Sequence, residues 1–385
     1  MKTETTNQPP ANHFLTHFKP LNDPRVNNAN MRHELSDILL LTVLAVICGA
    51  EGWSDVERFG KAKQKLLKDI LALPNGIPSH DILGDLFARL CPDTLQNCFL
   101  NWVQSMASLS QGEIVAIDGK TLRRSFKESG KKGAIHMVSA WATGNQLVLG
   151  QYKVDEKTNE ITAIPELIKL LNLSGSIVTI DAMGCQKKIT KAIRKADADY
   201  VLAVKENQKT LHDEIKRCLD AVIDDNFMID KTNYIETTEK AHGRIETRRY
   251  WITEAVDWIS GLENWTDLKS IGVVESERHE ISSGITSIER RYYIASINKD
   301  EKLFASAVRK HWGVENSLHW CLDVTFREDE SRIRQGFAAQ NMAVVRHIAL
   351  NFLKKEKSKM SVRGKRKKAG WDDDYLIKVL ADAIG

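Results

Sequence analysis

The stretches EIVAID (residues 113–118) and SIVTID (residues 176–181) decide the fold of this chain. Each is a short, almost continuously apolar run that ends in an aspartate, which is typical of a strand covered on both faces. The β-rich runs AIHMVSAWA (134–142) and QLVLGQYKV (146–154) come after the first stretch, with glycine-containing turns between the runs, and YVLAVK (200–205) comes after the second.

Helical patterns separate the later strands. Residues 163–173 and 185–196 are expected to be helices, and Pro165 fits the first turn of the earlier one. The order of elements is then β-β-β-α-β-α-β, which predicts an α/β fold with a ribonuclease-H-like mixed sheet. In a sheet of this order the first and fourth strands are neighbours. The fold by itself leaves the function open.

The sequence before and after these strands predicts how the rest of the chain is divided into domains. Residues 1–15 are expected to be a disordered N-terminus, and residues 16–105 to be an all-helical N-terminal domain. Residues 112–353 then form the strand-rich domain, in which the polar stretch from about 206 to 297 is a β-rich insertion that extends the sheet. Residues 354–385 are expected to be a basic C-terminal segment.

Two helices are expected to close the strand-rich domain. The stretch from residue 301 to about 325 returns to a helical period, and GFAAQNMAVVRHIALNFL (336–353) is predicted to be an amphipathic helix.

The composition is that of a folded protein with an uneven charge. Of its 385 residues, 42% are hydrophobic and 28% are charged, and the formal net charge is +4. Between residues 354 and 368, nine lysines and arginines face one glutamate, which gives +8 and leaves the rest of the chain at −4. Such a block is either a solvated tail or the electrostatic footprint of a polyanion such as nucleic acid.

Several classes of protein are disfavoured. The six cysteines form no C-x-x-C pair, which argues against a zinc finger or a disulfide scaffold and favours the reducing cytoplasm. The first residues are polar and predict no signal peptide, and the longest apolar run, residues 38–50, is too short to span a bilayer. We therefore expect a cytoplasmic protein without a membrane partner. Neither a P-loop nor a G-x-S-x-G elbow is present.

Asp118 and Asp181 end the two strands that should lie side by side. Adjacent carboxylates repel each other unless a cation or a proton lies between them, and their hard oxygens suit Mg²⁺ or Mn²⁺. The alternative is that Asp118 and the following glycine simply form the turn after a strand.

A third candidate lies in RKHWGVENSLHWCLD (309–323), where His311, Glu315 and His319 are spaced to share one face of an α-helix. Three interpretations remain open. The residues form a zinc stripe, or Glu315 pairs with Arg309 or His319 on a solvated face, or Glu315 completes a three-carboxylate site with the two aspartates. In the last case the histidines contact the substrate.

Three acids in the order Asp, Asp, Glu have a specific chemical use on this fold. Two divalent ions about 3.5–4 Å apart activate a water or a 3′-hydroxyl on one side of a phosphorus and stabilise the leaving oxygen on the other. The cofactor expected for such a site is two Mg²⁺ ions, with Mn²⁺ as a substitute.

At this point the residues resemble a known family. Several motifs are similar to those of the DDE transposases of bacterial insertion sequences, and more narrowly to the ISAs group and its H-repeat-associated proteins. They are IVAIDGKTLR (114–123), NEITAIPELI (159–168), TIDAMGCQ (179–186), AVKENQ (203–208), HGRIETR (242–248) and HWGVENSLHWCLDVTFRED (311–329). HELSDILLLTVLAVICGAEGW (33–53) and NGIPSHD (75–81) resemble the helical domain that precedes the catalytic domain in that group.

The resemblance implies a transposase that cuts DNA at the ends of an insertion sequence and joins the 3′ ends to a target. By motif, the catalytic and metal-binding acids are Asp118, Asp181 and Glu315. The implied partners are double-stranded DNA with terminal inverted repeats and target DNA, with a homodimer on DNA as one possible assembly, in the bacterial cytoplasm at the nucleoid.

The chain departs from the wider group at three positions around Glu315. Related transposases have a tyrosine seven residues before the glutamate, an arginine four residues before it and a lysine seven residues after it. Here these positions hold Val308, His311 and Leu322. The resemblance therefore does not imply that this chain processes its DNA ends through a hairpin intermediate, as those relatives do.

Other residues are expected to contact DNA, each with a simpler alternative. The alternatives are a solvated basic turn for the residues after Asp118, a helix cap for Asn207 and core packing for Trp312. Trp320, like Trp312, either stacks on a DNA base or packs in the core. The predicted DNA contacts are Lys120, Arg123, Arg124, Lys205, Asn207, Gln208, His242, Arg244, His311, Trp312 and His319.

Three rival functions stay open. The first is a DNA-binding remnant that does not carry out strand transfer, and the second is a hydrolytic DNA nuclease of the same fold. A glycosidase also uses two carboxylates, but it leaves the basic segment unexplained.

Overall fold

The computed structural model describes residues 10–26, 31–107, 109–125, 134–154, 159–224, 232–241 and 243–382. Most of the N-terminus that we expected to be disordered, residues 1–15, lies outside this part of the chain. The structure places a helix, α1 (Pro10–Phe18), across the end of that segment. Phe14 on this helix is buried and packs edge-on against Trp102.

The strands of the described residues form one mixed sheet, in the order β3-β2-β1-β4-β5-β9-β8-β7-β6. The first three are antiparallel, whereas β1, β4 and β5 are parallel, and this confirms the ribonuclease-H-like arrangement. The bounds are β1 (Ile114–Leu122), β2 (Ile135–Ala142), β3 (Leu147–Val154), β4 (Ile177–Ile180), β5 (Asp199–Val204), β6 (Thr232–Ala241), β7 (Arg244–Thr253), β8 (Ser270–Glu280) and β9 (Thr286–Ala295).

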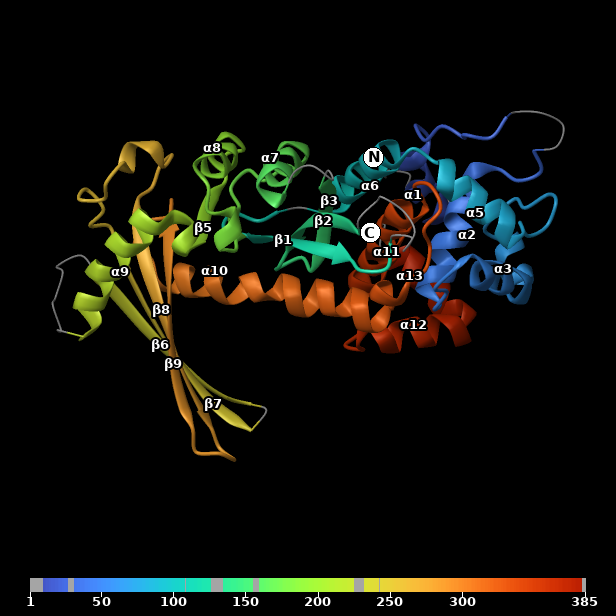
Figure 1. Cartoon of the computed structure of the whole chain (residues 1–385). Coiled ribbons are helices and arrows are strands. Elements are labelled where there is room, and N and C mark those ends of the chain that lie inside the picture. The colour runs from blue at the N-terminus through green and yellow to red at the C-terminus, as the bar shows by residue number, and fades with distance from the viewer. Residues whose placement is uncertain are drawn as a thin grey trace, which may run out of the picture.

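Helices cover both faces of the part of the sheet that runs from β3 to β5 (Figure 1). On one face, α7 (Glu160–Leu170) packs on β2 and β3, and α8 (Lys187–Lys195) packs on β5. On the other face, α10 (Glu301–Gly313) crosses β1, β4 and β5. All four residues of β4 are buried, which explains why its sequence is continuously apolar.

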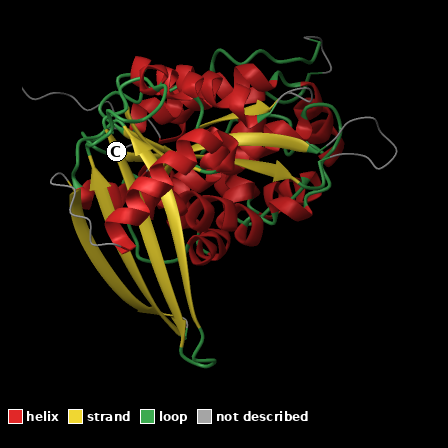
Figure 2. Cartoon of the chain, turned by 60° about the vertical axis from the view of Figure 1, so that its left-hand side comes forward, coloured by secondary structure: helices red, strands yellow, loops and turns green. Residues whose placement is uncertain are grey.

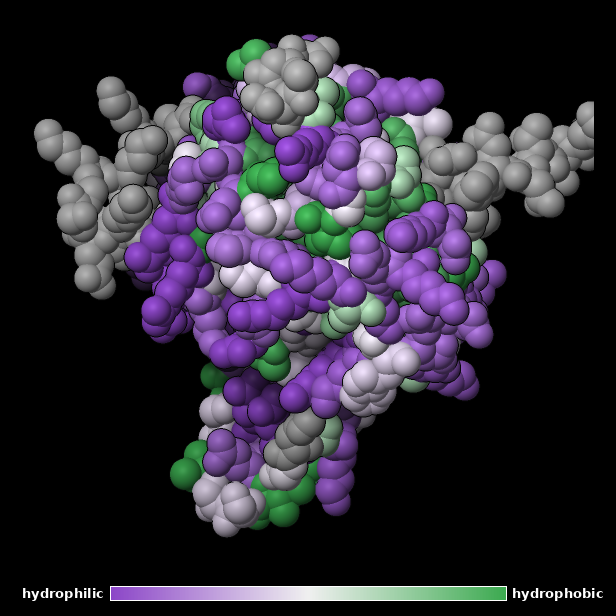
Figure 3. All heavy atoms as spheres, turned by 90° about the vertical axis from the view of Figure 1, so that its right-hand side faces the viewer, coloured by the Kyte–Doolittle hydropathy of each residue, from purple (hydrophilic) through white to green (hydrophobic). Residues whose placement is uncertain are grey.

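The insertion extends the sheet, as predicted. It begins with α9 (Lys209–Asp224), and its four strands join the sheet where β9 pairs with β5. The outer ends of these strands project from the body as a blade, and β9 runs from its tip to the body (Figures 1 and 2). Ile281, Ile285 and Ile288 are exposed near the tip, where Figure 3 shows hydrophobic side chains.

The N-terminal helices form the expected all-helical part of the chain. They are α2 (Leu35–Ile47), α3 (Trp53–Ala62), α4 (Gln64–Lys68), α5 (His80–Arg89) and α6 (Pro92–Met106). Ser79 caps α5 by accepting a hydrogen bond from the amide of Ile82, and Pro92 occupies the first turn of α6. On α2 every residue from Asp37 to Ile47 is buried.

The prediction that residues 336–353 form an amphipathic helix is wrong in one respect. The helix exists as α11 (Ala338–Lys355), but every residue from Ala338 to Leu353 is buried. The helical domain packs on one side of α11, through α2, α5 and α6, and the edge strand β3 packs on another. The helix is therefore the shared centre of two domains, and its residues Asn341, Arg346 and Asn351 form hydrogen bonds inside the protein.

The basic C-terminal segment is not a solvated tail. It contains the helices α12 (Val362–Trp371) and α13 (Asp373–Asp382), and Lys365 and Arg366 on α12 are 5% and 6% exposed. The Arg366 guanidinium donates to the backbone carbonyls of Val46 and Thr325, and so ties the last turn of α2 to the segment that follows Glu315. Two of the nine basic residues are thus unavailable to a polyanion.

Within the described part of the chain, no helix has the length and apolar character that crossing a membrane requires.

A buried asparagine protects the free edge of β3. The side-chain amide of Asn351 donates to the Val148 carbonyl and accepts from the Val148 amide, at 2.9 Å each. We expect Asn351→Leu to leave both backbone groups unsatisfied and to lower the free energy of unfolding by about 2–4 kcal/mol. Urea denaturation measures this effect. The control is Asn101→Leu on the exposed side of α6, and an equal loss in both variants would contradict the assignment.

Candidate active site

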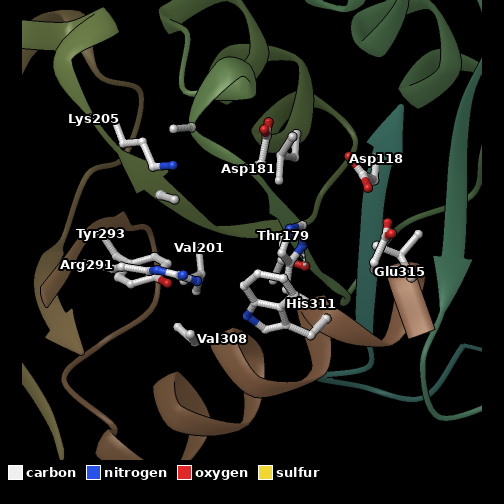
Figure 4. A pocket seen from close by; sticks show the side chains of 15 residues that line it. Asp118, Thr179, Asp181, Val201, Lys205, Arg291, Tyr293, Val308, His311 and Glu315 are labelled. Atoms are coloured by element: carbon white, nitrogen blue, oxygen red, sulfur yellow. Dashed lines mark hydrogen bonds between the residues drawn. The ribbon is translucent and has the colours of Figure 1, made fainter. Parts of the chain in front are cut away.

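The three predicted acids come together in one pocket of about 370 Å³ (Figure 4). Asp118 lies in β1, one residue beyond the last pair with β4, which joins Ile117 to Ile180. Asp181 follows β4 directly and begins the short 3-10 turn Ala182–Gly184, where its carboxylate accepts from the Met183 amide at 3.1 Å. Glu315 comes from the stretch that directly follows α10. The pairing of two parallel strands therefore fixes two of the acids, and a helix from the other face brings the third.

Glu315 does not lie on a regular α-helix, contrary to the predicted geometry. After Gly313 the chain forms two π-helical stretches, Val314–His319 and Cys321–Thr325. The Trp320 amide bonds to the carbonyl of Glu315, five residues back, and the Phe326 amide bonds to that of Cys321. Such π-bulges are frequent at functional sites because the wider turn re-aims side chains.

The two histidines beside Glu315 therefore take different positions. His311 Nδ1 lies 3.1 Å from Thr179 Oγ1, and burial lowers its pKa to about 4. His319 Nδ1 lies 3.1 Å from Glu315 Oε2 and 3.5 Å from Asp118 Oδ2. Because His311 turns away from the acids, the residues do not assemble the His-Glu-His zinc stripe.

His319 is a buried neighbour of the acids, not a surface contact for DNA. It is 4% exposed, and burial lowers its pKa. Ligand atoms of Asp118, Glu315 and His319 lie within 4.8 Å of one another, a spacing that suits a metal ion. His319 Nε2 is also buried and has no hydrogen-bond partner among the described residues.

Crowded carboxylates determine the electrostatics of the pocket. The pKa of Asp118 is raised to about 7, first because the group is buried and then because of the charges of Asp181, Glu160 and Glu315. The pKa of Asp181 is also raised, mainly by burial and also by Glu160. Ionising these carboxylates without a counter-charge is costly, and a divalent cation would supply that charge. Carboxylate oxygens are also ligands that such cations prefer.

Glu160 is a fourth acid that the sequence reasoning did not assign. It begins α7, and its carboxylate lies directly over Gly119 of β1, where a larger residue would displace it. His136 Nε2 bonds to Glu160, and His136 Nδ1 lies 2.7 Å from Thr121 Oγ1. The only signal in the sequence was the motif NEITAIPELI, which contains this glutamate.

The predicted basic contact Lys120 points inward. Its side chain is 10% exposed, and its ammonium bonds to Asp323 and, at 3.0 Å, to Glu328. Glu328 is also bound by Arg346, at 3.3 Å. Lys120 therefore joins β1 to the segment that follows Glu315 and is not free to contact a phosphate.

The other residues after Asp118 are on the surface. Arg123 has a side chain that is 78% exposed and lies 3.2 Å from Asp329. Arg124 is exposed as well, and its backbone carbonyl accepts a hydrogen bond from Arg334. Both stay predicted DNA contacts.

The residues that follow β5 lie beside Asp181. Lys205 is exposed and lines the pocket. Asn207 donates to the carbonyl of Ala182 at 2.7 Å, so it holds the loop after Asp181 and does not cap the following helix. Gln208 donates to the carbonyl of Cys185 at 3.0 Å and supports the same loop.

The remaining predicted contacts are scattered. Trp312 lines the pocket, whereas Trp320, 58% exposed, does not, so neither belongs to the core. Arg244 begins β7, opposite Glu280 of β8 in the strand register, near the tip of the blade and away from the acids. His242 lies outside the described residues. Arg291, on β9 of the insertion, lines the pocket and was missed because nothing in the local sequence relates it to the acids.

A ribonuclease-H-like sheet with two aspartates on neighbouring strands and a glutamate on the following helix defines a DDE-type domain. Residues 109–352 match the family described as "Transposase DDE domain", and residues 15–103 match the family described as "DDE_Tnp_1-associated". The chain therefore belongs to the DDE transposase family.

Relatives in Escherichia coli match nearly the whole chain. "H repeat-associated putative transposase YhhI" of strain K12 is 43% identical over 360 residues, which cover 91% of this chain and 93% of that protein. "Putative transposase YncI" of strain O157:H7 is 43% identical over 354 residues, 91% of this chain and 90% of that protein. A short relative of strain K12, "Inactive transposase YbfQ", is 57% identical over 57 residues, 15% of this chain and 68% of that protein.

The raised pKa of Asp118 predicts a pH-dependent stability. Without metal, the bound proton favours the folded state fully below pH 3.8, the usual pKa of this group, and this contribution is lost as the pH rises through about 7. We therefore expect the melting temperature of Asp118→Asn, relative to the original protein, to increase between pH 4 and 8 in EDTA. Mg²⁺ should reduce the difference at pH 8. A difference that does not change with pH would contradict the electrostatic account.

The position of Lys120 makes a second prediction. Lys120→Met leaves Glu328 buried without one of its cations, and we expect the free energy of unfolding to fall by about 3–5 kcal/mol in urea denaturation. The salt dependence of DNA binding should not change, because the ammonium is already paired. If Lys120 contacted a phosphate instead, the slope of log K against log salt would become shallower by about 0.9. Arg123→Met is the exposed control.

Proposed function

We propose that this chain is a Mg²⁺-dependent transposase that cuts DNA at the ends of an insertion sequence and joins the 3′ ends to target DNA. One observation carries the proposal: Asp118, Asp181 and Glu315, which come from separate elements, line one pocket, and no lysine or arginine of the described residues forms an ion pair with them. Nothing in the packing of the sheet requires three carboxylates at this point. Burying these carboxylates close together lowers the stability of the fold, and the binding of divalent ions would explain why they are there.

The residues present fit a two-ion site. Asp118, Asp181 and Glu315 would hold the ions, and Asp118 lies between the other two acids in Figure 4. When bound, two Mg²⁺ or Mn²⁺ ions would supply activation of a water or a 3′-hydroxyl and stabilisation of the leaving oxygen. Asp181 is pre-oriented for this role by the amides of Met183 and Gly184.

The other side chains of the pocket serve the DNA. His311 stays uncharged near neutral pH because burial lowers its pKa to about 4, so it contributes a hydrogen bond and no charge. Lys205 contributes a cation beside Asp181. The proposed substrates are double-stranded DNA with terminal inverted repeats and a target duplex, and two copies of the chain would bring the two ends together.

Substitution of the acids tests the proposal. We expect Asp181→Asn or Glu315→Gln to reduce Mg²⁺-dependent cleavage of an end-containing duplex by at least about a thousandfold, because each removes a ligand, while DNA binding in Ca²⁺ stays within about threefold. Glu206→Gln is the matched control, since this exposed acid lines a neighbouring groove near Asp181. Retained cleavage in the acid variants would contradict the proposal.

A pre-cut substrate separates joining from hydrolysis. A labelled duplex with a free 3′-hydroxyl end is mixed with a plasmid and Mg²⁺, and the transposase should produce covalently joined DNA. Cleavage without joining would identify a hydrolytic nuclease. Binding without either reaction would identify a DNA-binding remnant, an outcome that a relative named as inactive makes worth testing.

A further inference from the structure

The wall of the pocket that faces the acids is built partly by the insertion. Arg291 and Tyr293 of β9 line it together with Lys205, which follows β5 (Figure 4). Apolar residues, among them Val201 and Val308, line the space between this wall and the acids. A strand that is more than a hundred residues away from Asp181 in sequence thus contributes directly to the pocket.

Arg291 points into the pocket because side chains alternate along β9. The preceding residue, Arg290, faces the other side of the sheet, where it pairs with Asp220 and Asp224 on α9. The Arg291 guanidinium carbon lies 5.1 Å from the centre of the Trp312 ring. Its Nε and one terminal nitrogen, Nη2, donate to the two carboxylate oxygens of Glu289, at 2.8 and 3.1 Å, and the Glu289 side chain is 61% exposed.

These contacts orient the guanidinium and leave it open to solvent on one side. The Arg291 side chain is 36% exposed, and the aromatic ring supports one part of the group while Glu289 holds another. The other terminal nitrogen of Arg291, Nη1, has no carboxylate partner among the described residues, so this side of the guanidinium can donate to a phosphate. A merely structural arginine, such as Arg290, is instead surrounded by carboxylates: Asp220, Asp224 and Glu275.

The charges of the pocket also favour this role. Among the described residues that line it, the cations are Lys205 and Arg291, since His311 is uncharged near neutral pH. Once divalent ions neutralise the acids, an anionic DNA strand that enters the pocket meets both cations on the facing wall. Lys120 cannot take part, because it is bound to Asp323 and Glu328.

We infer that Arg291 binds a backbone phosphate of the DNA strand in the active site, so that the insertion supplies part of the site. This inference rests on the proposed function for the identity of the polyanion. It adds a phosphate-binding residue from β9 and assigns Trp312 the role of supporting the guanidinium. The opposing possibility is that Arg291 only stabilises β9 through Glu289 and Trp312.

The test compares Arg291→Gln with Arg290→Gln in the full-length protein. Binding is measured in Ca²⁺ to a duplex that carries the DNA flanking this reading frame, and to a series of the same duplex with one neutral methylphosphonate at successive positions of each strand. We expect Arg291→Gln to lower affinity for the unmodified duplex about tenfold. The slope of log K against log salt should become shallower by about 0.9.

The methylphosphonate series provides a readout that a structural role would not change. At the phosphate that Arg291 contacts, the neutral linkage should weaken binding by the original protein, while Arg291→Gln should bind both duplexes equally. Arg291→Lys should restore part of the affinity. Arg290→Gln should lower the melting temperature by breaking its pairs with α9, but it should respond to every neutral linkage as the original protein does.

Two results would overturn the inference. In the first, Arg291→Gln would bind the unmodified duplex as tightly as the original protein does. In the second, Arg291→Gln would lose affinity by the same factor on the unmodified duplex and on every methylphosphonate duplex. Neither result bears on the proposed chemistry, because binding in Ca²⁺ requires no cleavage. Conversely, a failure of the Asp181→Asn test would not change the binding result for Arg291.

Discussion

The parallel pairing of β1 with β4 is the constraint on which the candidate site depends. It brings Asp118 and Asp181 to one edge of the sheet, where neither forms an ion pair with a lysine or arginine of the described residues. The pairing is held by apolar packing on both faces, with all four residues of β4 buried. The free energy of that packing offsets the cost of burying the carboxylates beside one another, and the pKa of Asp118, raised to about 7 first by burial and then by the neighbouring acids, reflects this cost.

The third acid depends on a different set of contacts. Glu315 lies on a π-helical stretch, a conformation that is uncommon and needs support from its surroundings. Lys120 ties the chain after this stretch to β1, and Arg366 ties it to α2 through the carbonyls of Thr325 and Val46. The basic C-terminal residues and the helical domain thus help to position the carboxylate, although neither lines the pocket.

The sequence was a good guide wherever a pattern is local. Apolar runs ending in aspartate predicted β1 and β4 and their neighbourhood in the sheet, and the helical period of residues 301–325 predicted α10. It was a poor guide wherever a charged residue is paired across the fold. Lys120, Lys365 and Arg366 belong to basic stretches that are typical of phosphate contacts, and only their distant partners place them inside the protein.

By itself, then, the sequence determined the order of the elements, the neighbouring aspartates and the family, because these depend on short-range periodicity and on motifs. Tertiary structure decided which side chains share the pocket. Glu160 acts on the charges of Asp118 and Asp181 because α7 begins over Gly119, and Arg291 lines their pocket because β9 pairs with β5. Likewise α11 is buried on all sides because two domains pack around it. Such contacts join residues far apart in the chain, and no local pattern encodes them.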